Sequence, residues 1–385
     1  MSTGLKKAML KIIHFTTVHP RSDTRIHLKE IRTLAKRWPG EVSLFVQDGK
    51  GNEDHQAEGY TIHDTGPAEE GRLRRMTFGA WRMYHAVRRA KPTIAHIHDP
   101  ELLPWALLLR LTGVKVIYDV HENAPATVLS KNYLSPIVQR PIALAVHALE
   151  TGAKAVLSAV IAATRDIGEN FGSSAVLVQN FPILGELRQP NTSRHRDRPK
   201  DFAYVGGITA IRSAKEMVIA LEVLENPEVR LHMAGAFEQR SLEASVTAKP
   251  GWSSVEFHGW VGRDVVSEIL GKVRAGLVLF HPLPNHINAQ PNKLFEYMSA
   301  GLPVIASDFP LWREIIQASG SGLLVDPEDP EAIAEAMQWI LDHPEEAEAM
   351  GQRGRDAVEQ HYNWNAEAAK LIKLYEELLN TNKGK

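Results

Sequence analysis

The stretch QPNKLFEYMSAGLPVIASD, residues 290–308, predicts a short helix, a tight stop and then a buried strand. Pro291 suits the start of the helix, because its missing N–H would have no partner there. Gly301 suits the end of the helix, since a left-handed residue closes many helices. The apolar run 304–306 then favours a strand that is covered on both faces, as in a parallel sheet.

Glu296 is the residue of this helix that needs a chemical explanation. It stands between the apolar Phe295 and Tyr297 in an element built to be buried, whereas most glutamates are exposed. A carboxylate near a helix start can accept both hydroxyls of a ribose, and the helix N-terminus favours a nearby phosphate. Asn292 and Lys293, one turn earlier, could reach that phosphate or a sugar hydroxyl. We therefore predict that Glu296 holds a diol.

The length and composition of the chain indicate a globular protein of two domains. Its 385 residues exceed the usual size of one core, and 44% of them are hydrophobic. The absence of cysteine excludes disulfides and thiolate metal sites and favours a reducing, cytoplasmic location. Residues 1–200 carry more Lys and Arg than Asp and Glu, and the remainder carries the reverse. The two halves are therefore expected to have different partners.

The beginning of the sequence is basic and apolar, but it does not fit a signal peptide. Its apolar part is short, contains His14 and lacks a small-residue cleavage site, so we interpret residues 9–18 as a strand. No uncharged apolar run reaches about 18 residues, and we expect no membrane span.

Strand and helix patterns alternate in both halves of the chain. Such alternation predicts an α/β protein with parallel sheets and right-handed crossovers. We expect a first domain over 1–184, a polar linker over 185–201 and a second domain over 202–364. A final amphipathic helix and tail, 365–385, should pack back on the first domain.

Ligands of open parallel sheets bind beyond the carboxyl ends of the strands. In the second half, the candidate residues at these ends are Gly206, Gly207, Gly235 and His258. In the first half, the candidates are Arg21, Asp23 and Arg25 after the first strand and His121 after a later one. We expect both sets to face one cleft, with a nucleotide in the second domain and the other substrate in the first.

His96 and His98 lie on one face of a predicted strand, a pattern that raises the question of a metal site. No third ligand follows at a convincing spacing, so we expect no metal there. The chain also lacks an Asp-x-Asp pair that could hold a metal ion on a diphosphate. The missing Asp-x-Asp pair favours a metal-independent reaction.

Four stretches resemble the retaining glycosyltransferases of the GT-B fold that form family four, also called group 1. They are VHPRSDTRIHLKEIRTLAK (18–36), YDVHEN (118–123), YVGGITAIRSAKEMVIAL (204–221) and PNKLFEYMSAGLPVIASDFPLWREII (291–316). The last is the most specific match. The resemblance implies two Rossmann-like domains facing a cleft and transfer of a sugar from a nucleotide-diphosphate donor with retention of anomeric configuration.

The resemblance also implies roles for individual residues. Glu296 would contact the donor ribose, His121 the donor sugar or its phosphate side, and Arg212 the diphosphate, with Lys215 as a weaker candidate for that role. We therefore take His121, Arg212 and Lys293 as the catalytic candidates. The donor-binding candidates are Glu296, Asn288, Asn292, Gly206, Gly207, Gly235 and His258. No cofactor is expected besides the UDP or GDP of the donor, and the acceptor would be a glycan or a lipid-linked precursor of a polysaccharide.

Two departures from the family pattern matter. Asn288 stands where many relatives carry the first of two glutamates eight positions apart, and an amide carries no charge. This departure concerns the identity of the sugar more than the reaction. The first-domain loop is also not glycine-rich, so Arg21 or Arg25 could replace backbone groups as donors to phosphate.

The segment 71–92 combines seven basic residues and no acid with interleaved aromatic and aliphatic side chains. It fits either an ordinary crossover helix or an interfacial helix on an anionic membrane. An interfacial helix would suit a lipid-linked acceptor and peripheral contact at the inner face of the membrane. We expect no nucleic-acid partner, since the second half is acidic.

Two other functions fit the same architecture. One is a sugar-nucleotide 2-epimerase, which would use acid and base side chains such as His121. The other is a carbohydrate-binding protein without catalytic activity. An epimerase would need no acceptor, and a binding protein would release no sugar.

Overall fold

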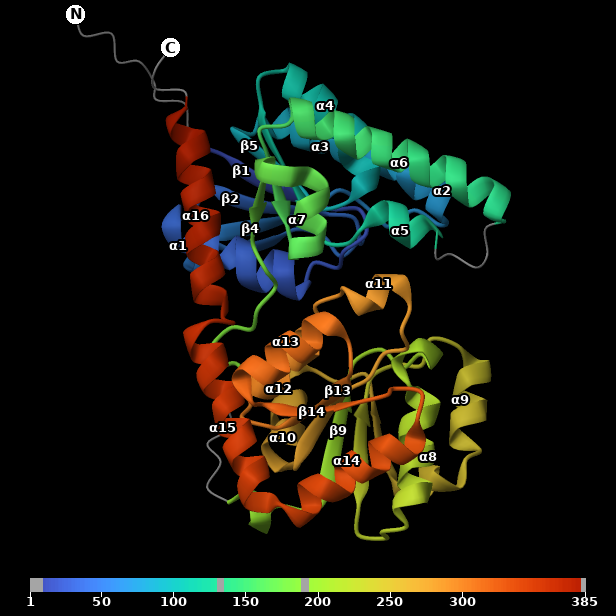
Figure 1. Ribbon diagram of the computed structural model, residues 1–385. Coiled ribbons are helices and arrows are strands. Elements are labelled where there is room, and N and C mark those ends of the chain that lie inside the picture. Colours follow the sequence, from blue (N-terminus) through green and yellow to red (C-terminus); the bar gives the residue numbers. More distant parts are fainter. Residues whose placement is uncertain (1–9, 130–134, 188–193, 382–385) are drawn as a thin grey trace, which may run out of the picture. The chain divides into compact units, whose positions relative to one another are not determined.

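The computed structural model describes residues 10–129, 135–187 and 194–381 (Figure 1). The chain forms two compact units. The N-terminal unit holds the described residues up to Asn180 together with those from Ala366 onward, and the C-terminal unit runs from Phe181 to Asn365.

The N-terminal unit is built on a sheet with strand order β3-β4-β2-β1-β5-β6-β7-β8. Only the β3–β4 pairing is antiparallel among the described strands. The strands are β1 (Ile12–Phe15), β2 (Val42–Val46), β3 (Glu53–His55), β4 (Tyr60–Asp64), β5 (Ile94–Ile97), β6 (Lys115–Val120), β7 (Ala159–Ala162) and β8 (Ala175–Leu177).

Helices cover both faces of this sheet. α3 (Ala80–Ala90), α4 (Leu103–Leu111) and α6 (Pro136–Val156) contribute to one apolar core with alternate strand residues such as Ile13 and Phe15. His14 points to the opposite face, since side chains alternate along a strand. That face carries the wide-turned helical segment Thr24–Ile31, α1 (Arg32–Arg37) and the C-terminal helix α16 (Trp364–Asn380).

The expectation that the C-terminal helix packs on the N-terminal domain is confirmed. The part of α16 from Ala366 onward belongs to the N-terminal unit. Tyr375 of this helix is fully buried, and its hydroxyl lies 2.9 Å from His14 Nε2 and 2.8 Å from His96 Nδ1.

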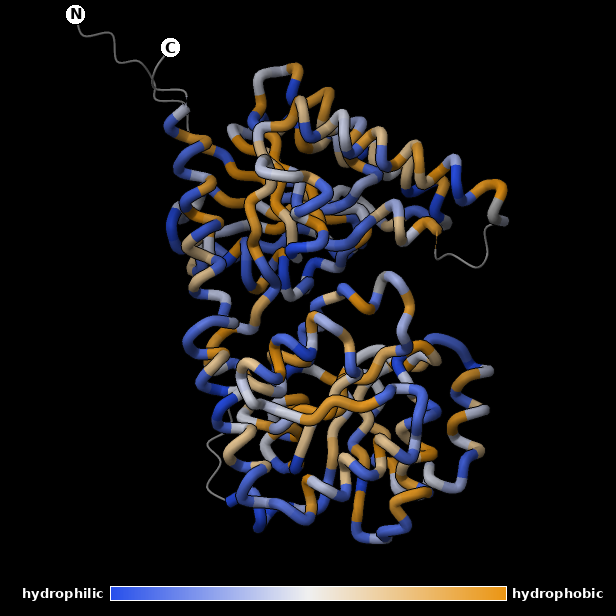
Figure 2. Tube along the Cα trace, in the orientation of Figure 1, coloured by the Kyte–Doolittle hydropathy of each residue, from blue (hydrophilic) through white to orange (hydrophobic). Residues whose placement is uncertain are grey.

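The C-terminal unit is built on a fully parallel sheet with order β11-β10-β9-β12-β13-β14. Its strands are largely hydrophobic in Figure 2, as expected of strands covered on both faces. They are β9 (Asp201–Val205), β10 (Arg230–Ala234), β11 (Val255–Gly259), β12 (Ala275–Val278), β13 (Val304–Ser307) and β14 (Gly322–Val325).

Two apolar cores lie on the two faces of this second sheet. α8 (Ala214–Leu224), α9 (Arg240–Thr247) and α14 (Pro330–Asp342) form one of them. The other is formed by α10 (Arg263–Lys272), α12 (Asn292–Ser299), α13 (Pro310–Ser319) and α15 (Pro344–Gln360). The doubly wound architecture predicted for both halves is therefore confirmed.

The predicted interdomain linker needs a correction. The described residues of 185–201 belong to the C-terminal unit, while 188–193 lie outside the described part of the chain. Leu187 is buried there, and His195 Nε2 donates to the carbonyl oxygen of Arg274 at 2.7 Å. These contacts tie the segment to the second sheet, so its polar composition did not indicate a free linker. Among the described helices, none is long and apolar enough to span a bilayer.

Candidate active site

Strand β9, in the middle of the second sheet, ends in a loop that only glycine can form. Gly206 and Gly235 have φ angles of 131° and 155°, which side-chain-bearing residues rarely adopt. A Cβ on Gly235 would overlap the carbonyl oxygen of Gly206. The ends of β9 and β10 therefore approach each other closely, with the Gly206 N–H donating to Ala234 O at 2.8 Å.

Two cationic side chains lie against this loop from different elements. Lys293 comes from the first turn of α12, and a Cβ on Gly206 would overlap its side chain. Arg212 comes from the turn before α8, and its Nη1 donates to Gly207 O at 3.1 Å. Both lie over the Phe280 ring, with Arg212 Cζ 5.3 Å and Lys293 Nζ 5.5 Å from its centroid.

Neither cation forms an ion pair with a carboxylate of the described chain. Lys293 Nζ donates to the Tyr204 hydroxyl at 3.1 Å, and that hydroxyl donates to Gly207 O at 2.6 Å. Burial, together with the charge of Arg212, outweighs the opposing charge of Glu296 and lowers the pKa of Lys293 to about 7. Two close cations without an ion-paired acid form a site that favours a multiply charged anion such as a diphosphate.

Glu296 lies one turn further along α12, and its side chain is 14% exposed. Its Oε1 accepts from Arg263 Nη1 at 2.7 Å, and Arg263 Nε donates to Glu186 Oε1 at 2.8 Å. Burial opposes the charge of Arg263, but its two carboxylate partners raise its pKa overall. The guanidinium therefore fixes Glu296 and occupies one of its oxygens.

The sequence did not single out Arg263, Glu186 or Tyr204. Arg263 begins α10 directly after Gly262, and this position beyond the end of β11 is the signal that could have pointed to it. Glu186 lay in the segment interpreted as a linker. Tyr204 has no sequence signal apart from its place two residues before Gly206.

The remaining donor-side candidates differ in their surroundings. Asn292 is exposed at the start of α12, and Asn288 is exposed at the end of the short helix α11 (Pro284–Ile287). His258 Nε2 lies 3.0 Å from His232 Nδ1, and His232 Nε2 lies 3.0 Å from Asp201 Oδ2. The contacts of His258 thus lead across the sheet from β11 to β10 and β9, and not to Arg212 or Lys293.

In the N-terminal unit, His121 follows β6 and is held by a buried carboxylate. Its Nε2 lies 2.7 Å from Asp119 Oδ2, and its side chain is 17% exposed. Asp119 accepts from Arg25 Nε at 2.9 Å and from Nη2 at 2.7 Å. Burial alone would raise the pKa of Asp119, but Arg25 keeps it well below its usual value. His121 is therefore oriented by a carboxylate that stays ionised.

The first-domain loop differs from the expectation that its arginines bind phosphate. Arg25 is buried in its pair with Asp119, and Arg21 binds Asp48 and Glu53. Their guanidinium groups are satisfied within the unit, so we assign both residues a structural part. Asp23 caps the helical segment that follows, because its Oδ1 accepts from the N–H groups of Arg25 and Ile26 at 2.9 Å.

His19 was not predicted, although it lies in the same loop. Its ring centroid is 5.0 Å from that of His121, and its Nδ1 is 3.4 Å from Asp23 Oδ2. Burial lowers the pKa of His19, but Asp23 and Asp99 outweigh that effect and raise it overall. The carboxyl-end loops of the first sheet thus carry two imidazoles, each beside an acid.

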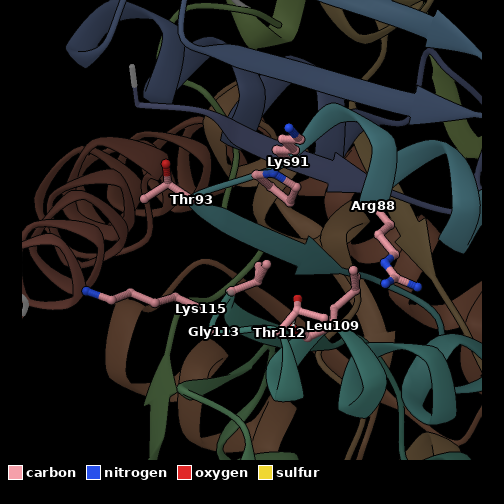
Figure 3. A pocket seen from close by; sticks show the side chains of 9 residues that line it. Arg88, Lys91, Thr93, Leu109, Thr112, Gly113 and Lys115 are labelled. Carbon is pink, nitrogen blue, oxygen red and sulfur yellow. Dashed lines mark hydrogen bonds between the residues drawn. The ribbon is translucent and has the colours of Figure 1, made fainter. Parts of the chain in front are cut away.

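A cavity of about 420 Å³ lies elsewhere in this unit, at the amino ends of β5 and β6 (Figure 3). None of the predicted site residues lines it. Its lining residues are Arg88, Lys91, Pro92, Thr93, Leu109, Thr112, Gly113, Val114 and Lys115.

Comparison with known proteins matches both halves of the chain to glycosyltransferase families. Residues 186–357 match the model for glycosyl transferases group 1, and residues 26–174 match that for glycosyltransferase family 4. The D-rhamnosyltransferase WbpZ of Pseudomonas aeruginosa is 27% identical over 170 residues, which span 43% of this chain and 42% of that protein.

Solved structures share the fold over nearly the whole chain. Sucrose-phosphate synthase from Thermosynechococcus elongatus superposes with a TM-score of 0.76 at 18% identity, covering 97% of this chain and 100% of that one. HepE from Anabaena in complex with UDP-glucose gives 0.71 at 11% identity, covering 96% and 100%. Both halves of the chain match glycosyltransferase families, and solved glycosyltransferase-type structures share its fold. The chain therefore belongs to the group 1 glycosyltransferases of the GT-B fold.

Proposed function

We propose that this glycosyltransferase uses a nucleoside-diphosphate hexose, with UDP or GDP as the carrier. The observation that carries the proposal is the pair of cations without an ion-paired acid, Arg212 and Lys293, beside the loop Gly206–Gly207. A site at the carboxyl end of a parallel strand is where such ligands bind. The UDP-glucose complex of HepE, a protein of the same fold, supports a donor of this class.

Arg212 and Lys293 would act on the bond that breaks. Negative charge grows on the diphosphate as the sugar leaves, and cations fixed beside it lower the barrier. The low pKa of Lys293 would rise when the diphosphate binds, so the lysine would be fully charged in the complex. Glu296 would hold the ribose diol through Oε2, the carboxylate oxygen to which Arg263 does not donate.

We further propose retention of anomeric configuration, with the departing phosphate accepting the proton of the acceptor hydroxyl. His121, oriented by Asp119, is the candidate in the N-terminal unit for contact with the sugar. An imidazole held by a carboxylate can exchange hydrogen bonds with sugar hydroxyls in either direction.

The test measures release of nucleoside diphosphate from a panel of UDP- and GDP-hexoses, with and without lipid-linked oligosaccharide acceptors. We expect release that depends on acceptor with one donor, and a loss of about 100-fold or more in kcat for Arg212→Met. Lys215, the weaker sequence candidate for the diphosphate cation, is exposed, so Lys215→Met is the matched control and should keep its activity. Conversion of the sugar without acceptor would contradict transfer, and an inverted anomeric centre in the product would contradict retention.

A separate observation favours an acceptor at an anionic membrane. In the segment 71–92, Leu73, Phe78 and Trp81 are 78%, 64% and 51% exposed among arginines. Exposed apolar side chains beside cations bind the surface of anionic bilayers. We expect the protein to sediment with vesicles that contain phosphatidylglycerol but not with phosphatidylcholine alone.

The double variant Phe78→Ser with Trp81→Ser should lose this sedimentation. Trp260→Ser, which changes an 82% exposed tryptophan of the C-terminal unit, should retain it. Equal binding by both variants, or no binding by the wild type, would contradict the membrane contact.

A further inference from the structure

Four potential metal ligands from three elements meet in the interior of the N-terminal unit. They are His14 on β1, Glu30 on the segment Thr24–Ile31, His96 on β5 and His98 directly after it. Each is 3% exposed or less. One ligand atom from each lies within 4.8 Å of all the others.

Several polar atoms of this cluster are buried without a hydrogen-bond partner. Within the described part of the chain, no donor forms a hydrogen bond with either carboxylate oxygen of Glu30 or with His96 Nε2. Glu30 Oε1 lies 3.2 Å from Arg25 Nε, whereas Oε2 faces the cluster at 3.7 Å from His14 Nδ1. A buried polar atom without a partner costs about 1–3 kcal/mol, so Glu30 Oε2 and His96 Nε2 favour a bound ligand.

The second nitrogen of each imidazole is held by a group outside the cluster. His14 Nε2 and His96 Nδ1 both lie within hydrogen-bond distance of the Tyr375 hydroxyl, at 2.9 and 2.8 Å. His98 Nδ1 lies 3.3 Å from Asp119 Oδ2. Histidines that bind metals nearly always donate their other N–H to such partners, which fixes the tautomer. The nitrogens that face one another inside the cluster are His14 Nδ1, His96 Nε2 and His98 Nε2, and the first and last of these lie within hydrogen-bond distance of each other.

We propose that His14, His96, His98 and Glu30 form a structural Zn²⁺ site. Three imidazole nitrogens and one carboxylate oxygen are ligands that zinc prefers, and four protein ligands leave no open position for catalysis. His14 Nδ1 lies 3.0 Å from His98 Nε2 and 3.7 Å from Glu30 Oε2. Ligands around a tetrahedral ion with bonds of about 2.0–2.1 Å stand roughly 3.3 Å apart, between these two separations.

The charges of the surroundings support a cation. Glu30 and Asp119 are both fully buried and share Arg25, whose single charge cannot neutralise two carboxylates. A divalent ion would supply the missing positive charge.

The test uses the full chain produced without a polyhistidine tag. After loading with Zn²⁺ and dialysis against metal-free buffer, elemental analysis should find about one zinc ion per chain. Chelator treatment should lower Tm, and added Zn²⁺ should restore it. Less than about one zinc ion in ten chains after loading would overturn the proposal.

Variants locate the ion. Tyr375→Phe keeps the packing of the ring but removes the hydroxyl shared by two ligands, and it should weaken Zn²⁺ binding about 10- to 100-fold in competition with a chelator. Glu256→Gln changes a 56% exposed member of the group His232, Glu256 and His258, and it should leave the affinity unchanged. The reverse pattern, or an octahedral spectrum after substitution by Co²⁺, would refute the assignment.

Discussion

The affinity for a nucleoside diphosphate should fall as the pH rises above 7, because Lys293 loses its proton. Burial and Arg212 lower the pKa of this lysine to about 7 in the free protein. A bound diphosphate favours the charged amine and raises that pKa. Between the two pKa values, binding therefore takes up a proton, and each further pH unit weakens it.

The size of the effect follows from the fraction of Lys293 that is charged. With a pKa of about 7, this fraction falls from about one half at pH 7.0 to about 3% at pH 8.5. Binding that requires the charged form should weaken about 15-fold over this range, or about 1.6 kcal/mol. The secondary phosphate ionisation is largely complete by pH 7, so the ligand itself contributes little.

Isothermal titration calorimetry from pH 7.0 to 8.5, with UDP or GDP, measures both the affinity and the proton uptake. Repeating the titration in two buffers of different ionisation enthalpy should show uptake of about half a proton at pH 7.0 and nearly one at pH 8.5. Lys293→Arg keeps a charge over the whole range and should show no pH dependence. Lys293→Met should bind at least about 10-fold more weakly at pH 7.0 and also lose the dependence.

A wild-type affinity that stays constant between pH 7.0 and 8.5 would refute the reasoning about Lys293. The reasoning would also be refuted if the affinity of Lys293→Arg fell with pH as steeply as that of the wild type, because another group would then be titrating.

Three further predictions concern single side chains. In urea denaturation, Gly235→Ala should destabilise the protein about 3 kcal/mol more than Gly40→Ala. Both glycines have positive φ, but only the Cβ added at Gly235 would overlap a carbonyl oxygen, that of Gly206. Glu296→Gln should weaken binding of UDP or GDP but not of inorganic pyrophosphate in calorimetry; equal losses would contradict a contact with ribose. Arg25→Met should cost about 3–5 kcal/mol of unfolding free energy, since it leaves buried carboxylates uncompensated, and a loss below 1 kcal/mol would contradict that account.

Local patterns were sufficient to predict the architecture and the cationic loop. Alternating strands and helices gave the two parallel sheets, and Gly301 has the expected positive φ of 73° after α12. Pro291 proved to be the residue just before the helix, one position earlier than predicted. Arg212 and Lys293 could be predicted because each follows a recognisable motif at a strand end or helix start.

Partners that come together only in the folded chain could not be predicted. Arg263 meets Glu296 across 33 positions, and no periodicity links them. Arg25 looked like a phosphate ligand in sequence, but it turns inward to pair with Asp119. His14 likewise reaches His98 only because β1 and β5 are neighbours in the sheet, so the rejection of a metal site rested on spacing along the chain alone.

The most direct test of the central claim is the binding of UDP, GDP and ADP to wild type, Arg212→Met and Lys215→Met at pH 7.0 by calorimetry. We expect one nucleoside diphosphate to bind wild type and Lys215→Met equally, and Arg212→Met to bind it at least about 10-fold more weakly. If no diphosphate binds, or if all three proteins bind alike, the loop at Gly206–Gly207 is not the donor site.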